Sequence, residues 1–124
     1  MDLTPVVSAG RQVIERYAPS GFRVAGVIWR GPVLVFPEET KPWTAAEAAA
    51  ITSDSLQPVV DHGGVQILLL GLGSRMAMIS HELRTSLRQS GIVIEAMDTG
   101  AACRTFNMLL AEERRVAAAL IPPV

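Results

Sequence analysis

The chain has 124 residues, of which 49% are hydrophobic and 19% are charged, and its net charge is -1. This length is enough to bury one hydrophobic core, so we expect a single domain over residues 1–124. The near-neutral charge excludes the broad positive field that attracts nucleic acid or anionic lipid. The composition is slightly more apolar than average, which leaves open whether part of the surplus lies in an interface, including one between copies of the chain.

The cysteine content and the start of the chain indicate a reducing compartment. Cys103 has no second cysteine to pair with, so the fold does not depend on a disulfide. Residues 1–5 contain an early acid and no basic segment before a long apolar run, which is unlike a secretory signal. Apolar stretches such as residues 67–70 are far shorter than the ~20 residues that span a bilayer. We expect a soluble cytoplasmic protein that is not an integral membrane protein.

The first third of the chain is predicted to form antiparallel strands. Apolar residues recur at alternate positions over residues 22–26, and an apolar run at residues 33–36 follows an Arg-Gly-Pro turn. An earlier strand is expected at about residues 12–17. Two or three antiparallel strands are therefore expected, with Pro37 and Pro42 ending the β region.

Two helical segments are predicted to follow. Thr44 and Glu47 have the spacing of a capping box, which favours an α-helix over residues 44–51. A second helical stretch is expected to begin at residue 53 or 54 and to run to Val60. The paired glycines that follow His62 favour the left-handed backbone that ends a helix.

From Val65 onward the pattern predicts a β-α-β-α-β unit. Continuous apolar strands indicate burial on both faces, and strands separated by helices are expected to run parallel. The expected elements are strands at residues 67–70, 92–96 and 116–120 and helices at about residues 79–89 and 100–113. The sequence thus predicts an α/β fold with a mixed sheet covered by helices.

The glycine pair Gly71 and Gly73 follows a buried strand, where dinucleotide sites place a phosphate loop, and Glu95 ends the next strand. Met76 stands where that motif requires a small residue, so a structural turn is the favoured interpretation. The loop also lacks the Lys and Ser/Thr pair of a phosphate-binding P-loop. Arg75 has two possible interpretations: it contacts a small anion, or it is a solvated arginine on an exposed loop.

A second candidate segment joins the strand at residues 92–96 to the following helix. Free backbone N–H groups at a helix start attract negative charge, but Asp98 at this position would occupy them as a cap. Thr99 is the alternative cap, which would leave Asp98 free to pair with Arg104. Both alternatives remain open at this stage.

No set of residues in the sequence points to catalysis or metal binding. Cys103 lies on the buried stripe of its predicted helix, and a catalytic thiol needs an exposed position beside a base. His62 and His81 have no identifiable orienting acid and no metal-ligand spacing. Ser80 has no nucleophile-elbow pattern around it. We therefore assign no catalytic residue, no metal site and no cofactor.

Four segments closely resemble the Mth938-like family (DUF498). They are ILLLGLG at residues 67–73, GIVIEAMDT at 91–99, AACRTFNML at 101–109 and VAAALIP at 116–122. Residues 22–36 are also similar to the early β region of this family. The resemblance implies a three-layer α/β fold with N-terminal antiparallel strands, and it carries no established enzymatic activity or catalytic residue set. Many relatives have Gly-Thr-Gly at residues 71–73, so Leu72 removes one hydroxyl from this loop.

Two functions follow as hypotheses. The family includes mitochondrial proteins that help assemble respiratory complex I, together with bacterial members of uncharacterised role. The resemblance therefore implies a non-enzymatic accessory protein, in a bacterium an assembly factor for a membrane complex that acts from the cytosolic side by binding another protein.

The alternative is a small-molecule or anion-binding protein, or an enzyme, with a pocket at the carboxyl ends of the parallel strands. The residues predicted to bind a ligand or a partner are Gly71, Gly73, Asp98, Thr99, Arg104 and Asn107. Arg104 and Asn107 have no evident structural role in the sequence. Their replacement is therefore predicted to weaken binding with little loss of stability.

Overall fold

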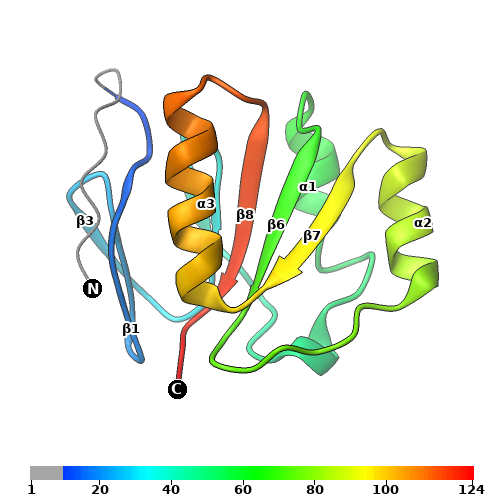
Figure 1. Cartoon of the computed structure of the whole chain (residues 1–124), viewed down its shortest axis with the longest axis horizontal. Coiled ribbons are helices and arrows are strands. Elements are labelled where there is room, and N and C mark those ends of the chain that lie inside the picture. Colours follow the sequence, from blue (N-terminus) through cyan, green and yellow to red (C-terminus); the bar gives the residue numbers. More distant parts are fainter. Residues whose placement is uncertain (1–9) are drawn as a thin grey trace.

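The computed structural model describes residues 10–124, which form two β-sheets and several helical segments (Figure 1). The smaller sheet is antiparallel and contains β1 (Ile14–Ala18), β2 (Gly21–Val24) and β3 (Val27–Arg30) in that order. The larger sheet has the order β5-β4-β8-β6-β7, with β4 (Val33–Val35), β5 (Thr40–Pro42), β6 (Ile67–Leu72), β7 (Val93–Met97) and β8 (Val116–Ile121). The helical segments are η1 (Ala48–Ala50), α1 (Gln57–His62), α2 (His81–Gln89) and α3 (Thr99–Ala111).

The β-α-β-α-β unit is confirmed, with element ends close to those predicted. β8 and β7 both pair with β6 in parallel, while β4 pairs with β8 in the antiparallel direction. The sheet is therefore mixed, as predicted. Of the expected N-terminal strands, those at about residues 12–17 and 22–26 correspond to β1 and β2 of the antiparallel sheet, whereas the apolar run at residues 33–36 forms β4 of the larger sheet. The third strand of the antiparallel sheet, β3, was not predicted.

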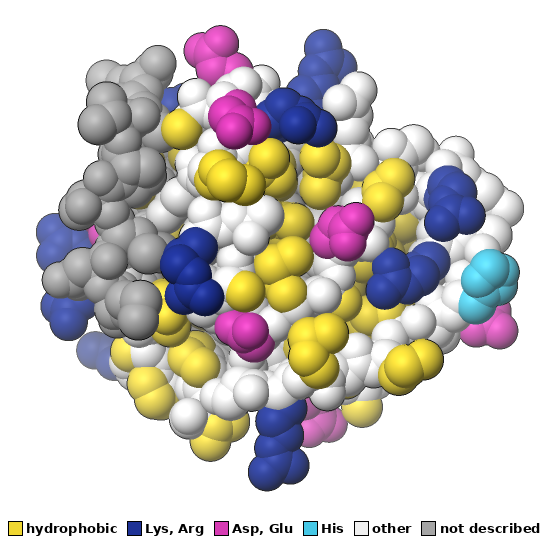
Figure 2. Space-filling view, viewed as in Figure 1, with side chains coloured by type: hydrophobic (Ala, Val, Ile, Leu, Met, Phe, Trp, Pro, Cys, Tyr) yellow, Lys and Arg dark blue, Asp and Glu magenta, His cyan; other side chains and the backbone are white. Residues whose placement is uncertain are grey.

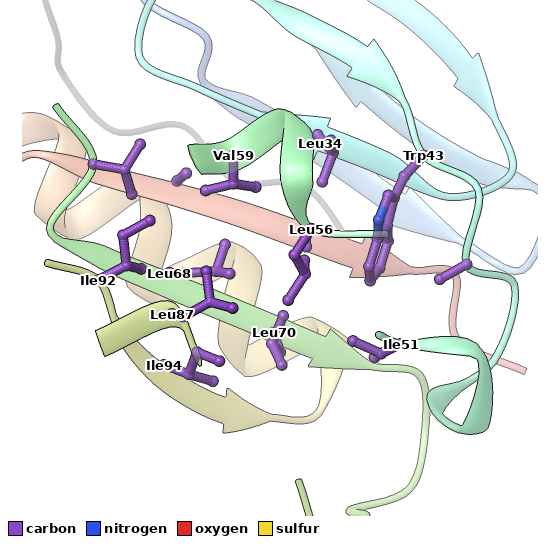
Figure 3. Close-up of a cluster of buried hydrophobic side chains, with 14 of the residues drawn as sticks. Leu34, Trp43, Ile51, Leu56, Val59, Leu68, Leu70, Leu87, Ile92 and Ile94 are labelled. Atoms are coloured by element: carbon purple, nitrogen blue, oxygen red, sulfur yellow. The ribbon is translucent and has the colours of Figure 1, made fainter. Parts of the chain in front are cut away.

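The five-stranded sheet is the middle of three layers. One face carries α3 and the three-stranded sheet, and the other carries α1, α2 and the segment around η1 (Figure 1). Alternate residues of β8 belong to two separate hydrophobic clusters, with Ala117 and Ala119 on one face and Ala118 and Leu120 on the other. Figure 3 shows the first cluster, in which Leu56 and Val59 lie over Leu68 and Leu70 of β6.

The α-helix predicted over residues 44–51 is wrong. Only the single 3₁₀ turn η1 forms there, and Glu47 precedes it in an extended conformation without a side-chain capping bond. The reason lies in tertiary burial. Trp43 and Ala45 are both buried at the alternating spacing of an extended chain, and the Trp43 indole donates to the Ser55 carbonyl at 2.8 Å. The burial of Trp43 and Ala45 therefore outweighs the local preference of this segment for a capped helix.

The β region also extends further than predicted. Pro42 does not exclude a strand, because it is the last residue of β5, which pairs with β4 at the edge of the sheet. A proline is tolerated at an edge, where its missing N–H breaks no ladder bond. Pro37 does lie in the turn between these strands, where the Phe36 N–H donates to the Glu39 carbonyl at 2.8 Å. Within residues 10–124, no helix has the length and apolar character required to cross a membrane.

Candidate functional site

Thr99 joins the carboxyl ends of β6 and β8 to the start of α3. Its side chain is fully buried, and its Oγ1 accepts a hydrogen bond from the Gly73 N–H at 2.8 Å and donates to the Ile121 carbonyl. The Thr99 N–H in turn donates to the Gly73 carbonyl at 2.9 Å. The parallel strands thus bring Gly71, Gly73 and Thr99 together as predicted, and this junction fastens two strands to a helix.

Gly71 is required at this junction by close packing. A Cβ at this position would lie 2.8 Å from Leu120 Cδ2 and 3.1 Å from both Thr99 Cα and Oγ1. Gly73, with a φ of 81°, adopts the left-handed backbone that turns the chain away after β6. Both positions therefore require glycine for structural reasons, independent of any ligand.

Asp98 is the N-cap of α3. Its Oδ1 accepts a hydrogen bond from the Ala101 N–H at 2.9 Å, and its backbone is extended, with φ at -64° and ψ at 159°. The N–H groups of Thr99 and Ala101 are thus already bonded to protein oxygens. The geometry decides between the two predicted caps in favour of Asp98, and it places a carboxylate where an anion would have to bind.

Arg104 lies further along α3 and is exposed. Its Nη1 donates to the Tyr17 hydroxyl at 3.4 Å, and Gly100 leaves room for that ring, since a Cβ there would lie 2.8 Å from the hydroxyl oxygen. Arg104 therefore connects α3 to the three-stranded sheet at the surface. Its guanidinium remains accessible to a partner.

Asn107 is buried and structural, which corrects the prediction that it has no structural role. Its side chain is 4% exposed and bonds both backbone groups of Ile14 in β1: the Ile14 N–H donates to Oδ1 at 2.9 Å, and Nδ2 donates to the Ile14 carbonyl at 2.9 Å. The amide therefore supplies hydrogen-bond partners to the N–H and the carbonyl of Ile14 at the edge of β1. Asn107 cannot contact a partner without displacing β1.

Cys103 belongs to the core, as predicted from its position on α3. It is fully buried in the cluster between the two sheets, and burial raises the pKa of its thiol from 9.0 to about 12. The thiolate, which is the nucleophilic form, is therefore absent at neutral pH.

Cys103 is expected to resist thiol reagents in the native protein. A disulfide reagent followed by absorbance should react slowly in native buffer and rapidly in denaturant, because the reaction requires unfolding. The raised pKa also means that the native state keeps the thiol proton longer than the unfolded state. Its contribution to stability is thus present below pH 9.0 and is lost as the pH rises towards about 12, relative to Cys103→Ala. Rapid stoichiometric labelling of the native protein would show that Cys103 is accessible.

A hollow of about 440 Å³ lies beside this junction, at the carboxyl ends of β6 and β8. Gly73, Ser74 and Arg75 line it on one side, and Ala46 and Glu47 line it on the other. Of the six residues predicted to bind a ligand, Gly73 alone lines this hollow. Within residues 10–124, no cluster of three or more histidine, cysteine or acidic side chains is placed to hold a metal ion.

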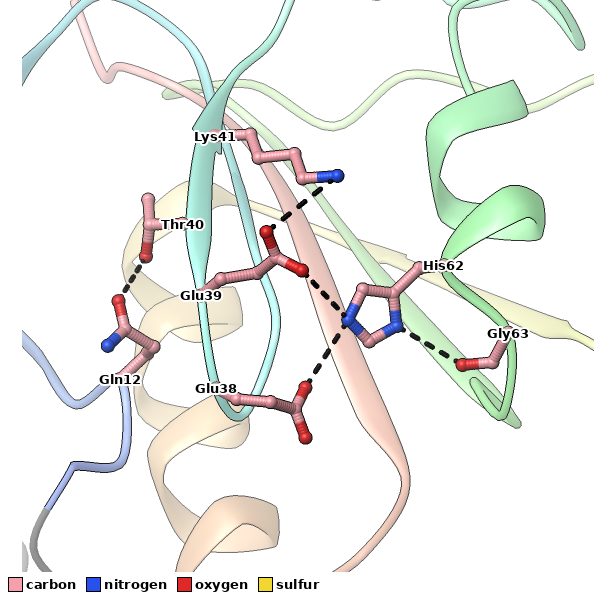
Figure 4. Close-up of polar contacts among 7 residues, drawn as sticks. All are labelled: Gln12, Glu38, Glu39, Thr40, Lys41, His62 and Gly63. Carbon is pink, nitrogen blue, oxygen red and sulfur yellow. Dashed lines mark hydrogen bonds and ion pairs between the residues drawn. The ribbon is translucent and has the colours of Figure 1, made fainter.

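His62 forms a polar contact that the sequence did not indicate (Figure 4). Its ring stacks on Phe36 with 3.9 Å between the centroids, and Nε2 lies 3.3 Å from Glu38 and 3.5 Å from Glu39. These contacts hold the end of α1 against the β4–β5 turn. The signal available in the sequence was the acidic pair between Pro37 and Thr40, but its pairing with His62 depends on the tertiary fold.

Thr99→Val is expected to lower the free energy of unfolding by about 2 kcal/mol, because two buried backbone groups lose their partner while the shape is kept. Thr99→Ser keeps the hydroxyl and is expected to lose about 1 kcal/mol or less through the missing methyl group. Urea denaturation of both variants measures the difference. Equal stabilities of the two variants would show that the hydroxyl bridge contributes nothing.

The three-layer arrangement, with a mixed sheet between α3 plus a small antiparallel sheet and α1 plus α2, defines a Mth938-like domain. The family model described as protein of unknown function (DUF498/DUF598) matches residues 14–121. The chain belongs to this family.

Relatives of the chain include both bacterial and animal proteins. A protein of Rhodobacter capsulatus, described as uncharacterised, is 39% identical over 114 residues, which cover 92% of this chain and 87% of the relative. NADH dehydrogenase [ubiquinone] 1 alpha subcomplex assembly factor 3 of Danio rerio is 38% identical over 117 residues, covering 94% of this chain and 67% of the relative. The chain thus spans about two thirds of the length of this animal relative.

The fold is also found in a solved structure. The solution structure of a Bordetella pertussis protein described as a Mth938-like domain aligns with a TM-score of 0.82 and 28% identity, over 98% of this chain and 92% of that one. The likeness extends over both sheets, because it covers almost the whole chain.

Proposed function

We propose that this chain is a non-enzymatic accessory protein that assists the assembly of a membrane-bound respiratory complex by binding one of its protein components. The observation that carries the proposal is the 38% identity, over 94% of the chain, to a protein named as an assembly factor of NADH dehydrogenase. Such similarity over the whole domain favours a related surface as well as a related fold. We place the chain on the cytoplasmic side of the membrane.

The predicted site residues are engaged in structural contacts, which supports a role in binding a protein over catalysis or ligand binding at the strand ends. The Thr99 hydroxyl and the Asn107 amide are engaged in buried structural hydrogen bonds, and the Cys103 thiol is sealed in the core. By contrast, large apolar side chains are exposed at the surface, with Met76 at 65%, Met78 at 97% and Met108 at 54%. Figure 2 shows hydrophobic side chains on the surface over and beside α3. Exposed methionines adapt readily to partner surfaces.

The proposal is tested by affinity purification of the tagged full-length chain from its host after mild crosslinking. Quantitative mass spectrometry is expected to find subunits of the NADH dehydrogenase enriched over an unrelated tagged control of similar size. Their absence from the purified material, with the tagged chain well recovered, would contradict a role in assembling this complex.

The ligand-binding alternative rests on the hollow of about 440 Å³ beside Gly73 and Arg75. A thermal-shift screen of small anions and metabolites tests it, because a bound ligand raises the melting temperature by mass action. A shift that disappears in Arg75→Ala but persists in Arg88→Ala would support this alternative. The absence of any shift at high ligand concentration would count against it.

A further inference from the structure

β3 is an open edge of the three-stranded sheet, because among residues 10–124 it pairs with β2 alone. The Gly31 N–H donates to the Ser20 carbonyl at 3.1 Å, which fixes the hydrogen-bonding phase of this antiparallel pair. Hydrogen-bonded and non-hydrogen-bonded pairs alternate along such a ladder. The backbone N–H and C=O groups of Ile28 and Arg30 therefore point away from β2, towards the outside of the sheet.

Within residues 10–124, a side chain or a proline takes up part of each of the other sheet edges. The Asn107 amide covers both backbone groups of Ile14 on β1, and Arg84 Nη1 donates to the Ile94 carbonyl of β7 at 2.8 Å. β5 ends at Pro42. Proteins protect their sheet edges against unwanted pairing, and among residues 10–124 no side chain bonds the outward backbone groups of Ile28 and Arg30.

The side chains beside this edge are apolar and positively charged. Ile28 is 72% exposed, and in the register of the sheet it lies directly across from Arg23, with Arg30 two residues further on the same face. Arg16 lies across from Arg23 on the other side, so the two arginines are direct cross-strand neighbours.

Among residues 14–30, which form this sheet, negative charge is scarce. Glu15 is the one acidic residue between residues 14 and 30, and it lies 3.3 Å from Arg23 Nε. A hollow of about 170 Å³ opens between Arg23, Ile28 and Arg30. Figure 2 shows basic side chains gathered at the margin of the molecule where Figure 1 places the three-stranded sheet. The positive charge is therefore local, since the whole chain carries a net charge of -1.

We propose that β3 is the docking edge for an extended acidic segment of a partner protein, which adds to the sheet as a fourth strand. Its backbone would bond the outward groups of Ile28 and Arg30, its carboxylates would meet Arg23 and Arg30, and an apolar side chain would cover Ile28. A second copy of this chain is the less favourable occupant, because it would place arginines against arginines. This inference rests on the proposed function, since it names the surface through which the chain binds another protein.

The probe is a fluorescein-labelled peptide of alternating glutamate and valine, with a matched peptide of alternating lysine and valine as its control. Fluorescence anisotropy with the full-length chain at low salt is expected to show at least about tenfold tighter binding of the glutamate peptide, because charge complementarity selects the partner. Equal binding of the two peptides, or no binding of either, would overturn the proposal.

Three variants locate the contact. Arg30→Glu reverses a charge at the edge, and Arg88→Glu on α2 makes the same change at an exposed position away from the three-stranded sheet. Ile28→Pro removes an N–H that points outward, so it is expected to leave the β2–β3 ladder intact. Arg30→Glu and Ile28→Pro are each expected to weaken glutamate-peptide binding at least about tenfold, and Arg88→Glu by less than about twofold. Unchanged binding by Ile28→Pro, with its fold confirmed by amide NMR spectra, would overturn the strand-addition geometry.

Three further outcomes distinguish the docking edge from a dimer interface and from the proposed function. Concentration-dependent dimerisation that Ile28→Pro abolishes, without glutamate-peptide binding, would assign the edge to a second copy and overturn the acidic partner. If Ile28→Pro still enriches subunits of the NADH dehydrogenase as the wild type does, the proposed function stands and the docking edge is wrong. If the wild type enriches none of them, the proposed function fails, and the peptide measurements still decide whether β3 binds acidic strands.

Discussion

Phe106→Ala is expected to lower the free energy of unfolding by about 3–5 kcal/mol. Phe106 is fully buried on α3, in the cluster that joins the three-stranded sheet to the five-stranded sheet. Its neighbours there include Phe22 and Val24 from the small sheet and Leu69 and Leu120 from the large one. Removing the ring leaves a cavity between two sheets, which the backbone cannot close without moving one of them.

Urea denaturation followed by circular dichroism measures this loss, and Met108→Ala is its matched control. Met108 lies two residues further on the same helix but is 54% exposed, so its truncation is expected to change stability by less than about 0.5 kcal/mol. A loss below about 1 kcal/mol for Phe106→Ala would mean that α3 does not pack between the sheets as described.

Asn107→Ala is expected to cost about 3 kcal/mol, because it leaves the N–H and the carbonyl of Ile14 without their partners in a buried environment. The first strand should also loosen, since these bonds hold the inner edge of β1. Amide hydrogen exchange should therefore show faster exchange at Ile14 than in the wild type. The same denaturation experiment gives the energetic cost.

Arg104→Ala is the control for Asn107→Ala, because it removes an exposed polar side chain one turn away on α3. Its stability is expected to stay within about 1 kcal/mol of the wild type, since the contact with Tyr17 lies at the surface. Wild-type stability of Asn107→Ala would contradict its structural role and would return it to the set of residues available to a partner.

The structural role of Asn107 could not be predicted from the sequence, whereas the parallel strands could. The apolar pattern after Val65 predicted β6, β7 and β8 and their parallel direction, because continuous apolar strands separated by helices favour parallel pairing. The same pattern could not reveal that Asn107 bonds Ile14, which lies 93 residues away in the chain. A polar residue with a distant backbone partner looks like a free polar residue in the sequence.

The sequence predicted where the candidate site lies, but it did not predict the hydrogen bonds that its side chains form. Gly71, Gly73 and Thr99 meet because the carboxyl ends of parallel strands lie at one edge of the sheet. That the Thr99 hydroxyl closes this junction depends on side-chain geometry that no spacing reveals. The open edge of β3 was equally hidden, because it requires the order of the strands and not only their existence.

The amount of assembled NADH dehydrogenase in the membranes of a host strain that lacks this chain tests the assembly role most directly. Native gel electrophoresis with in-gel activity staining is expected to show less of the full complex and an accumulation of partial assemblies. Expression of the wild-type chain should restore the full complex. An unchanged amount of the full complex in the strain that lacks the chain would contradict the proposed function.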